Sequence, residues 1–190
     1  MEFNFFTLVF LFAILTSVLA LLWLNFRQDK AIDNSFDSVP DGFSETIKLE
    51  DHQKAGRYTK AKLLLNHFEI IFSTIVLLVW TLGGAMNWID GYWSQKIDDP
   101  VLMGTFFVLS IMLIASFIDL PFSIYRNFVL EHKFGFNRMT AGTFAADLIK
   151  EVILSLILVL PLIYAILYLM NIESIGNYWW IYAWAIISLF

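Results

Sequence analysis

Long apolar stretches separated by short polar segments dominate this chain. They lie at approximately 3–26, 68–86, 101–125, 148–170 and 178–190. The first four are about as long as the roughly 20 residues that an α-helix needs to cross a hydrocarbon core of about 30 Å. The pattern therefore predicts an all-α polytopic membrane protein with four full transmembrane helices.

The last apolar run, 178–190, is too short to span in the same way. At about 1.5 Å per residue its helix would be only about 20 Å long. Neither a glycine nor a basic residue follows Phe190 to end it. Two interpretations stay open: a truncated fifth transmembrane helix of a longer protein, or a segment that does not span.

A polar segment, 27–67, connects the first two apolar runs. It starts with two turn signals, Asp33-Asn34-Ser35 and Pro40-Asp41-Gly42. From about Leu49 a helical pattern begins, with apolar and small residues spaced three and four apart. Ser44 or Thr46 is the expected N-cap of this helix. With no breaker before Gly83, we expect the helix to run directly into the second span, or alternatively to lie with its basic face on anionic headgroups.

Basic residues alternate between the connecting segments. The segment 27–67 holds seven Lys and Arg residues, the next one holds Lys96 alone, and four more lie between Arg126 and Lys150. The positive-inside rule then predicts an outside N-terminus and cytoplasmic segments at 27–67 and about 126–147. Because Met1-Glu2 lacks a basic n-region, we expect the first helix to be retained rather than cleaved as a signal peptide.

The composition excludes several classes of protein. Only 15% of the residues are charged, against about 25% in soluble domains. The chain has no cysteine, which excludes disulfides, thiolate zinc sites and cysteine nucleophiles. No sustained basic stretch accompanies the aromatic residues, so we do not expect a nucleic-acid partner. The bilayer is the expected environment.

Asp119 is the most conspicuous ionisable residue within an apolar run. An intramembrane carboxylate is a functional candidate by default. Arg126 follows two helical turns later and Pro121 lies between them, so an ion pair with Arg126, or a role in satisfying a helix break, is the favoured alternative. Asp147, Lys150 and Glu151 share one helical face and indicate charge balance at a helix start.

Two further features are interpreted as architectural. Gly83-Gly84 permits a bend or a close helix contact, and Pro161 is expected to kink the fourth span. The three histidines do not form an HExxH arrangement. We therefore expect no catalytic residue and no metal ligand within residues 1–190.

The most distinctive segment lies between the third and fourth apolar runs. Phe134 and Phe136 bracket Gly135, with Glu131, His132 and Lys133 just before them. Such a loop can place apolar side chains under a helical bundle while the glycine allows a tight turn. A purely structural plug is the alternative interpretation.

Four sequence blocks together resemble the N-terminal membrane region of the type I CAAX prenyl proteases, integral-membrane zinc metalloendopeptidases. They are Leu49–Ala55 with Tyr58 and Lys62, Leu82-Gly83-Gly84 with Asn87–Asp90, Leu120–Ser123 with Tyr125, and Glu131–Asn137. The last block, with Glu131, Lys133, Phe134, Gly135, Phe136 and Asn137, is the most specific. We place these six residues in a structural or chamber-lining loop.

The resemblance implies a seven-helix bundle around an intramembrane chamber. It also implies a zinc ion held by an HExxH motif and a downstream glutamate, and peptide or membrane-protein substrates. None of those zinc ligands has a matching position here, so the catalytic motif is expected beyond residue 190 and these residues alone are expected to be inactive. A bacterial inner membrane is the expected location. A transporter or channel subunit, and a non-catalytic membrane scaffold, remain alternative functions.

Overall fold

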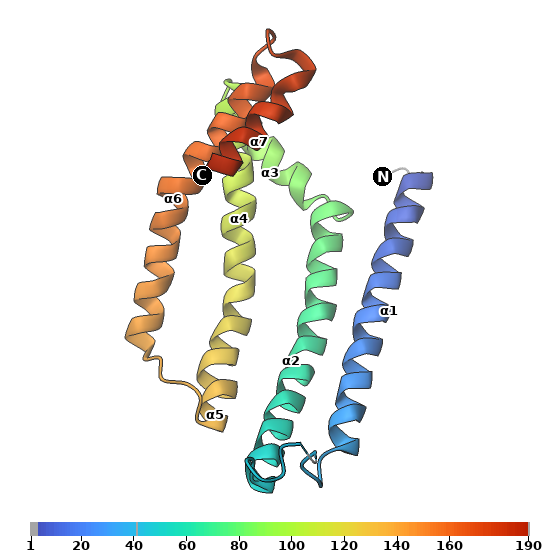
Figure 1. Cartoon of the computed structure of the whole chain (residues 1–190). Helices are drawn as coiled ribbons and strands as arrows, with labels where there is room; N and C mark the ends of the chain where they lie inside the picture. Colours follow the sequence, from blue (N-terminus) through green and yellow to red (C-terminus); the bar gives the residue numbers. More distant parts are fainter. Residues whose placement is uncertain (1–3, 41, 190) are drawn as a thin grey trace. The chain divides into compact units, whose positions relative to one another are not determined.

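The computed structural model describes residues 4–40 and 42–189 of the chain (Figure 1). Met1, Glu2, Phe3, Asp41 and Phe190 lie outside the described residues. Met1-Glu2, part of the second turn signal and the last residue of the final apolar run are therefore positions that the structure does not describe.

The described residues are helical with short connections and contain no strand. Four of their helices are long and apolar enough to cross a membrane, namely α1 (Phe5–Asn34), α2 (Leu49–Thr81), the continuous helix Pro100–Phe134, and α6 (Ala141–Asn171). Each contains one of the first four apolar runs or most of it. The prediction of an all-α architecture with four spanning helices is confirmed.

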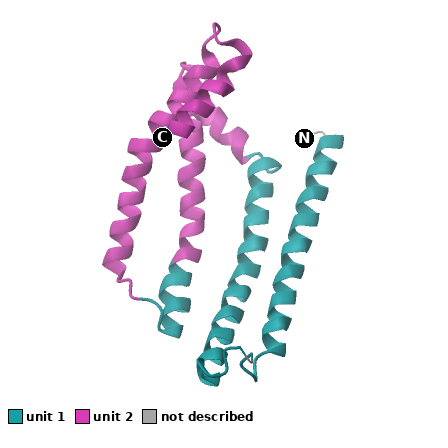
Figure 2. Ribbon diagram, in the orientation of Figure 1, with its two compact units in different colours: residues 1–84, 124–137 teal, residues 85–123, 138–190 magenta. Residues whose placement is uncertain are grey.

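The chain divides into two compact units, each described by itself (Figure 2). Unit 1 covers Met1–Gly84 and Ile124–Asn137, and unit 2 covers Ala85–Ser123 and Arg138–Phe190. Unit 1 therefore joins the first two long helices to a segment that lies far from them in the sequence. The most distinctive sequence motif belongs to that segment.

In unit 1 the two long helices α1 and α2 pack against each other. Leu63 and Ile70 of α2 are among the buried apolar side chains. Asn66 Nδ2 donates to Asn25 Oδ1 of α1 at 3.3 Å, and Asn25 is 8% exposed. This bond gives the buried Asn25 Oδ1 a donor, whereas Asn25 Nδ2 is buried with no hydrogen-bond partner among the described residues, and an unpaired polar group is costly at an apolar seam.

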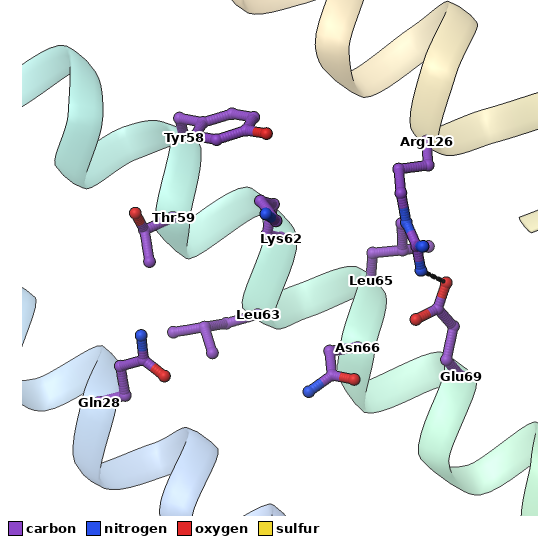
Figure 3. Close-up of a pocket in the computed structure, with 9 residues that line it drawn as sticks. All are labelled: Gln28, Tyr58, Thr59, Lys62, Leu63, Leu65, Asn66, Glu69 and Arg126. Carbon is purple, nitrogen blue, oxygen red and sulfur yellow. Dashed lines mark hydrogen bonds and ion pairs between the residues drawn. The ribbon is translucent and has the colours of Figure 1, made fainter. Parts of the chain in front are cut away.

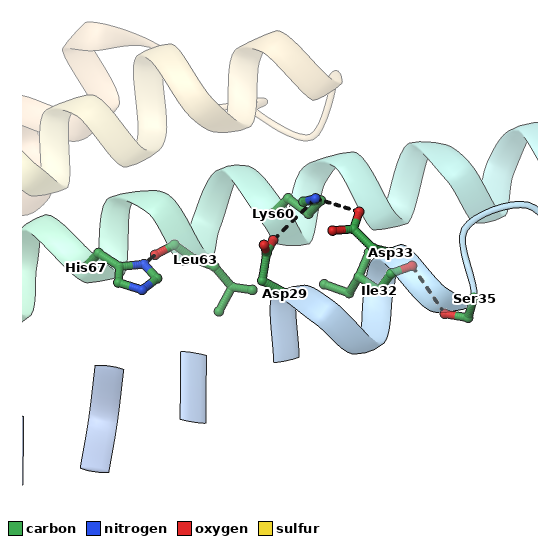
Figure 4. Close-up of polar contacts among 7 residues, drawn as sticks. All are labelled: Asp29, Ile32, Asp33, Ser35, Lys60, Leu63 and His67. Carbon is green, nitrogen blue, oxygen red and sulfur yellow. Dashed lines mark hydrogen bonds and ion pairs between the residues drawn. The ribbon is translucent and has the colours of Figure 1, made fainter. Parts of the chain in front are cut away.

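Polar contacts join the C-terminal end of α1 to the N-terminal half of α2 (Figure 4). Lys60 Nζ lies 2.7 Å from Asp33 Oδ1 and 3.4 Å from Asp29 Oδ1. His52 Nε2 lies 2.8 Å from the Ser35 carbonyl oxygen. The polar first half of α2 thus packs on the end of α1, which explains why helix α1 continues beyond its apolar run to Asn34.

The start of α2 differs from the expectation. Lys48 is the N-cap residue and makes no side-chain capping hydrogen bond. The Thr46 hydroxyl instead donates to the Phe43 carbonyl oxygen at 3.2 Å, closing the preceding turn. Ser44 and Thr46 were therefore wrong as caps, because the turn at 43–47 uses local hydrogen bonds before the helix begins. The prediction that α2 continues without a break into the second span is confirmed.

Gly83 and Gly84 end α2 rather than bringing two helices together. The Leu82 and Gly83 amides both donate to the Leu78 carbonyl oxygen, at 2.8 and 2.9 Å. Gly84 has φ 81°, in the left-handed region that favours glycine. A separate helix, α3 (Ala85–Ser94), follows at once, where the sequence indicated only a connecting segment.

Unit 2 contains α3, most of α4 (Pro100–Ile124), α6, a 3₁₀ turn (Gly176–Tyr178) and α7 (Trp179–Leu189). The Trp93 indole N–H donates to Ser110 Oγ at 2.9 Å, and the Trp93 ring stacks on Phe106 with centroids 5.0 Å apart. These contacts fix α3 on α4. Pro161 lies inside α6, which continues past it to Asn171.

Candidate functional site

The polar half of α2 carries Tyr58, whose side chain reaches the motif segment. Its hydroxyl donates to a Glu131 carboxylate oxygen, joining residues that are 73 positions apart in the chain. Tyr58 is half-buried, as is Glu131. Since a hydrogen bond to an ionised acceptor is stronger than a neutral one, this contact is a firm attachment of the motif segment to α2.

The motif segment reaches Tyr58 because the helix before it changes its geometry. Pro121 was expected to disrupt the backbone, but α4 continues through it to Ile124. The change comes later, where Tyr125–Glu131 forms a π-helix, followed by the short helix α5 (His132–Phe134). Most of the segment expected to be a connecting loop is therefore helical, since its residues continue the backbone hydrogen bonding of the span before it.

A left-handed glycine ends this helix. Gly135 has φ 76°, and the amides of Phe136 and Asn137 both donate to the Glu131 carbonyl oxygen, at 2.9 and 3.2 Å. The expectation of a tight turn at Gly135 is confirmed. Because the chain reverses there, the rings on either side of the glycine can approach the same target.

That target is again Tyr58. Phe134 and Phe136 each meet the Tyr58 ring edge-on, with centroids 5.3 and 4.9 Å apart. We call Tyr58, Glu131, Phe134 and Phe136 the Tyr58 cluster. Edge-on aromatic pairs contribute about 0.5–1.5 kcal/mol each beyond the area they bury, so the cluster attaches the loop by its rings as well as by its carboxylate.

Three lysines surround the aromatic rings of the Tyr58 cluster. Lys54 Nζ lies 5.4 Å from the Phe136 centroid, Lys62 Nζ 5.2 Å from Tyr58, and Lys133 Nζ 5.9 Å from Phe134. These distances suit cation–π contacts, which contribute about 0.5–1 kcal/mol at exposed sites. The cluster is thus an aromatic centre with a basic rim, and Asn137 stands half-buried at its edge.

A second polar contact ties the π-helix to α2. Arg126 Nη2 lies 2.5 Å from Glu69 Oε1. Arg126, Glu69 and Tyr58 belong to the lining of a cavity of about 340 Å³ in unit 1 (Figure 3). The guanidinium that the sequence offered as one possible partner for Asp119 is thus paired with a carboxylate of α2.

Glu69 was not among the predicted site residues, although the sequence contains a signal for it. Glu69 is the only Asp, Glu, Lys or Arg within the apolar run 68–86, and an ionisable residue in such a run is a functional or pairing candidate. Its partner lies 57 positions away. Only the fold could identify that partner.

The remaining candidates belong to unit 2. Asp119 is an exposed residue of α4 in unit 2. Lys150 Nζ lies 3.3 Å from Asp147 Oδ1 on the exposed face of α6, which confirms that these two charges meet.

No group of three or more His, Asp or Glu side chains is placed to hold a metal ion among residues 4–40 and 42–189. His67 Nδ1 lies 2.6 Å from the Leu63 carbonyl oxygen of its own helix. The described residues therefore do not fit a zinc site. The chemistry that the Tyr58 cluster offers is attachment and positioning.

A comparison with protein families shows which family this chain belongs to. Residues 28–190 match the family described as "CAAX prenyl protease N-terminal, five membrane helices". The chain belongs to this family. The matched residues contain α2, the continuous helix Pro100–Phe134, α6 and the shorter α7, whereas α1 lies mostly before them. The chain is an integral membrane protein.

Curated relatives carry the same family name. The chain is 31% identical over 173 residues to the "CAAX prenyl protease 1 homolog" of Dictyostelium discoideum, covering 87% of this chain and 39% of that protein. It is 36% identical over 177 residues to the homolog of Taenia solium, covering 85% of this chain and 37% of that protein. The chain thus spans about 40% of the length of the curated relatives it matches.

A solved structure has the same fold. The crystal structure of S. mikatae Ste24p matches with a TM-score of 0.84 at 21% identity, covering 100% of this chain and 44% of that one. This likeness supports the all-helical membrane fold. The predicted resemblance to the N-terminal membrane region of the CAAX prenyl proteases is therefore confirmed by sequence and by fold.

Proposed function

We propose that this chain is the N-terminal membrane portion of a zinc metalloendopeptidase that cleaves peptides near a prenylated cysteine. Its own contribution is to form part of the wall and scaffold of an intramembrane chamber. The observation that carries the proposal is the Tyr58 cluster. Its residues come from two of the family blocks, separated by more than 70 positions, and they contact each other directly.

The geometry supports a scaffold role for the Tyr58 cluster. Glu131 accepts from Tyr58 through its side chain and from Phe136 and Asn137 through its carbonyl oxygen. One residue thus holds both α2 and the turn at Gly135. A loop fixed in this way keeps its shape when a substrate approaches, which is what preorganised sites require.

We propose zinc for the whole protein but assign no zinc ligand among the described residues. When bound elsewhere in such an enzyme, zinc supplies an activated water for hydrolysis. The expected ligand set, an HExxH motif with a downstream glutamate, is absent from residues 1–190. We therefore assign no catalytic step to any residue of this chain.

The proposed topology places the N-terminus outside and the segments 27–67 and 126–147 in the cytoplasm. We propose 1–26 as the first transmembrane segment, 27–67 as a cytoplasmic segment and 68–190 as the remaining membrane helices. The contacts of Tyr58 with Glu131 and of Glu69 with Arg126 support one side of the membrane for both basic segments, since each joins α2 to the π-helical region. A bacterial inner membrane is the proposed location, which fractionation of the source cells tests.

Two measurements test the proposed function. The encoding DNA is read downstream of codon 190, where an in-frame HExxH is expected, and a stop codon in its place contradicts the proposal. The protein that this gene encodes is then purified and offered a farnesylated peptide. Cleavage is expected to stop with a chelator and to return with added zinc. Ion flux through liposomes containing the protein, lost in Asp119→Asn, would instead favour a transporter.

A further inference from the structure

Unit 1 holds two cavities that both involve α1 and α2. The first, of about 340 Å³, is lined by polar and charged side chains that include Gln28, Lys62, Asn66 and Arg126 (Figure 3). The second, of about 280 Å³, is mostly apolar. Its lining residues are Ile14, Ser17, Val18, Leu21, Ile70, Ser73, Thr74 and Leu77.

The helical register places both cavities along one groove. Gln28 follows Ser17 by eleven positions on α1, and Leu77 follows Asn66 by eleven positions on α2. Eleven residues make about three helical turns, so each pair lies on nearly the same face of its helix, about 16 Å apart along the axis. The polar cavity and the apolar cavity therefore lie one after the other along the seam between α1 and α2.

The polar cavity lies at the level where the membrane surface is expected. The apolar run of α1 ends at Phe26, and Arg27 follows with its guanidinium carbon 4.9 Å from the Trp23 ring centroid. Aromatic and basic residues together mark the boundary between hydrocarbon and headgroups. The apolar cavity, about 16 Å further along α1, then falls near the middle of a hydrocarbon core about 30 Å thick.

The charges of the polar cavity favour an anion. Lys62 and Arg126 supply two cations, and Glu69 offsets only one of them. Lys62 pairs with no carboxylate among the described residues; its ammonium lies over the Tyr58 ring. Gln28 and Asn66 add amide groups that can donate to phosphate oxygens.

We propose that this groove binds one anionic phospholipid, with its phosphate at Lys62 and Arg126 and one acyl chain along the apolar cavity. Basic pockets between membrane helices are typical sites for anionic headgroups. A soluble phosphate would leave the apolar cavity unused, whereas a phospholipid fills both and matches their separation. The site is independent of the proposed protease function.

The test uses the purified 190-residue chain in nanodiscs with equal amounts of phosphatidylglycerol and phosphatidylcholine that have the same acyl chains. Lipids that stay bound after transfer to detergent are counted by native mass spectrometry. Phosphatidylglycerol is expected to be retained about fivefold more than phosphatidylcholine, the ratio that one basic side chain near an anionic surface provides. Equal retention of the two lipids overturns the proposal.

Variants separate this site from general attraction to the membrane. Lys62→Gln is expected to remove the preference and Lys62→Arg to keep it. Lys30→Gln is the matched control, because Lys30 is an exposed cation of α1 outside the cavity lining. If Lys30→Gln lowers the preference as much as Lys62→Gln, the anion is attracted by overall charge and the proposal fails.

The placement of the acyl chain is tested by filling the apolar cavity. Ser73→Leu is expected to lower phosphatidylglycerol retention severalfold, since the new side chain occupies the acyl path. Ser73→Ala is the control, because it loses only the hydroxyl that donates to the Ile70 carbonyl oxygen. Unchanged retention in Ser73→Leu, or equal competition by glycerol phosphate without acyl chains, would show a headgroup or phosphate site and would overturn the assignment of a lipid.

Discussion

The attachment of the motif loop to α2 makes Tyr58→Phe an informative perturbation. The substitution removes the hydroxyl that donates to Glu131 but keeps the ring that Phe134 and Phe136 contact. A hydrogen bond to a charged group contributes about 1.5–3 kcal/mol when it is well shielded from water. Because Tyr58 and Glu131 are only half-buried, we expect a loss of about 1–2 kcal/mol in the local stability of the loop.

Amide hydrogen exchange measures this loss directly. The amides of Phe136 and Asn137 are bonded to the Glu131 carbonyl oxygen, so they report opening of the turn. A loss of about 1.4 kcal/mol raises their exchange rate about tenfold. Exchange on α3 near Trp93, in unit 2, is the internal reference and is expected to stay unchanged.

Two outcomes would refute this reasoning. Unchanged exchange at Phe136 and Asn137 would mean that the hydrogen bond does not hold the loop. Equal acceleration in both units would mean that Tyr58→Phe lowers global stability rather than releasing one attachment. Tyr58→Leu, which removes the aromatic ring as well, is expected to accelerate exchange further than Tyr58→Phe, because it also loses both edge-on ring contacts.

Three further predictions follow from other features. Gly135→Ala is expected to cost about 1–2 kcal/mol because a Cβ is unfavourable in the left-handed region, while Gly42→Ala, with open space around it, is the near-neutral control in thermal unfolding. Ser110→Ala removes the acceptor of the Trp93 indole and is expected to cost about 1 kcal/mol, with a change in tryptophan fluorescence; unchanged fluorescence contradicts the contact. A reporter fused at Lys48 is expected to be cytoplasmic, and an exposed periplasmic reporter would reverse the proposed topology.

The long helices could be predicted because apolar length alone determines them. A run such as 101–125 has no stable alternative to a helix in hydrocarbon, where every backbone polar group needs an internal partner. The continuity of α2 was equally predictable, since its polar half contains no proline and a single glycine, Gly56. Gly56 itself lies where the connecting segment packs, with a hypothetical Cβ 3.2 Å from the Phe36 ring.

The site could be predicted only in part. The motif Glu131–Asn137 stood out in the sequence, and Tyr58 was noted with another block, but nothing local showed that the two meet. Glu69 and Arg126 illustrate the reason. Their pairing depends on the relative placement of α2 and the π-helix, which the periodicity of either helix does not contain.

The π-helix at Tyr125–Glu131 has a consequence for how the chain tolerates insertions and deletions. A π-helical stretch holds more residues per turn than an α-helix, so it behaves as an α-helix that has absorbed an extra residue. Deleting one of the residues 125–130 would let the backbone return to α-helical bonding and rotate His132–Phe134 by about 100° about the helix axis. Phe134 would then turn away from Tyr58, although no residue of the Tyr58 cluster had been changed. The phase of this one helix is thus as important for the loop as the identity of the residues that it carries.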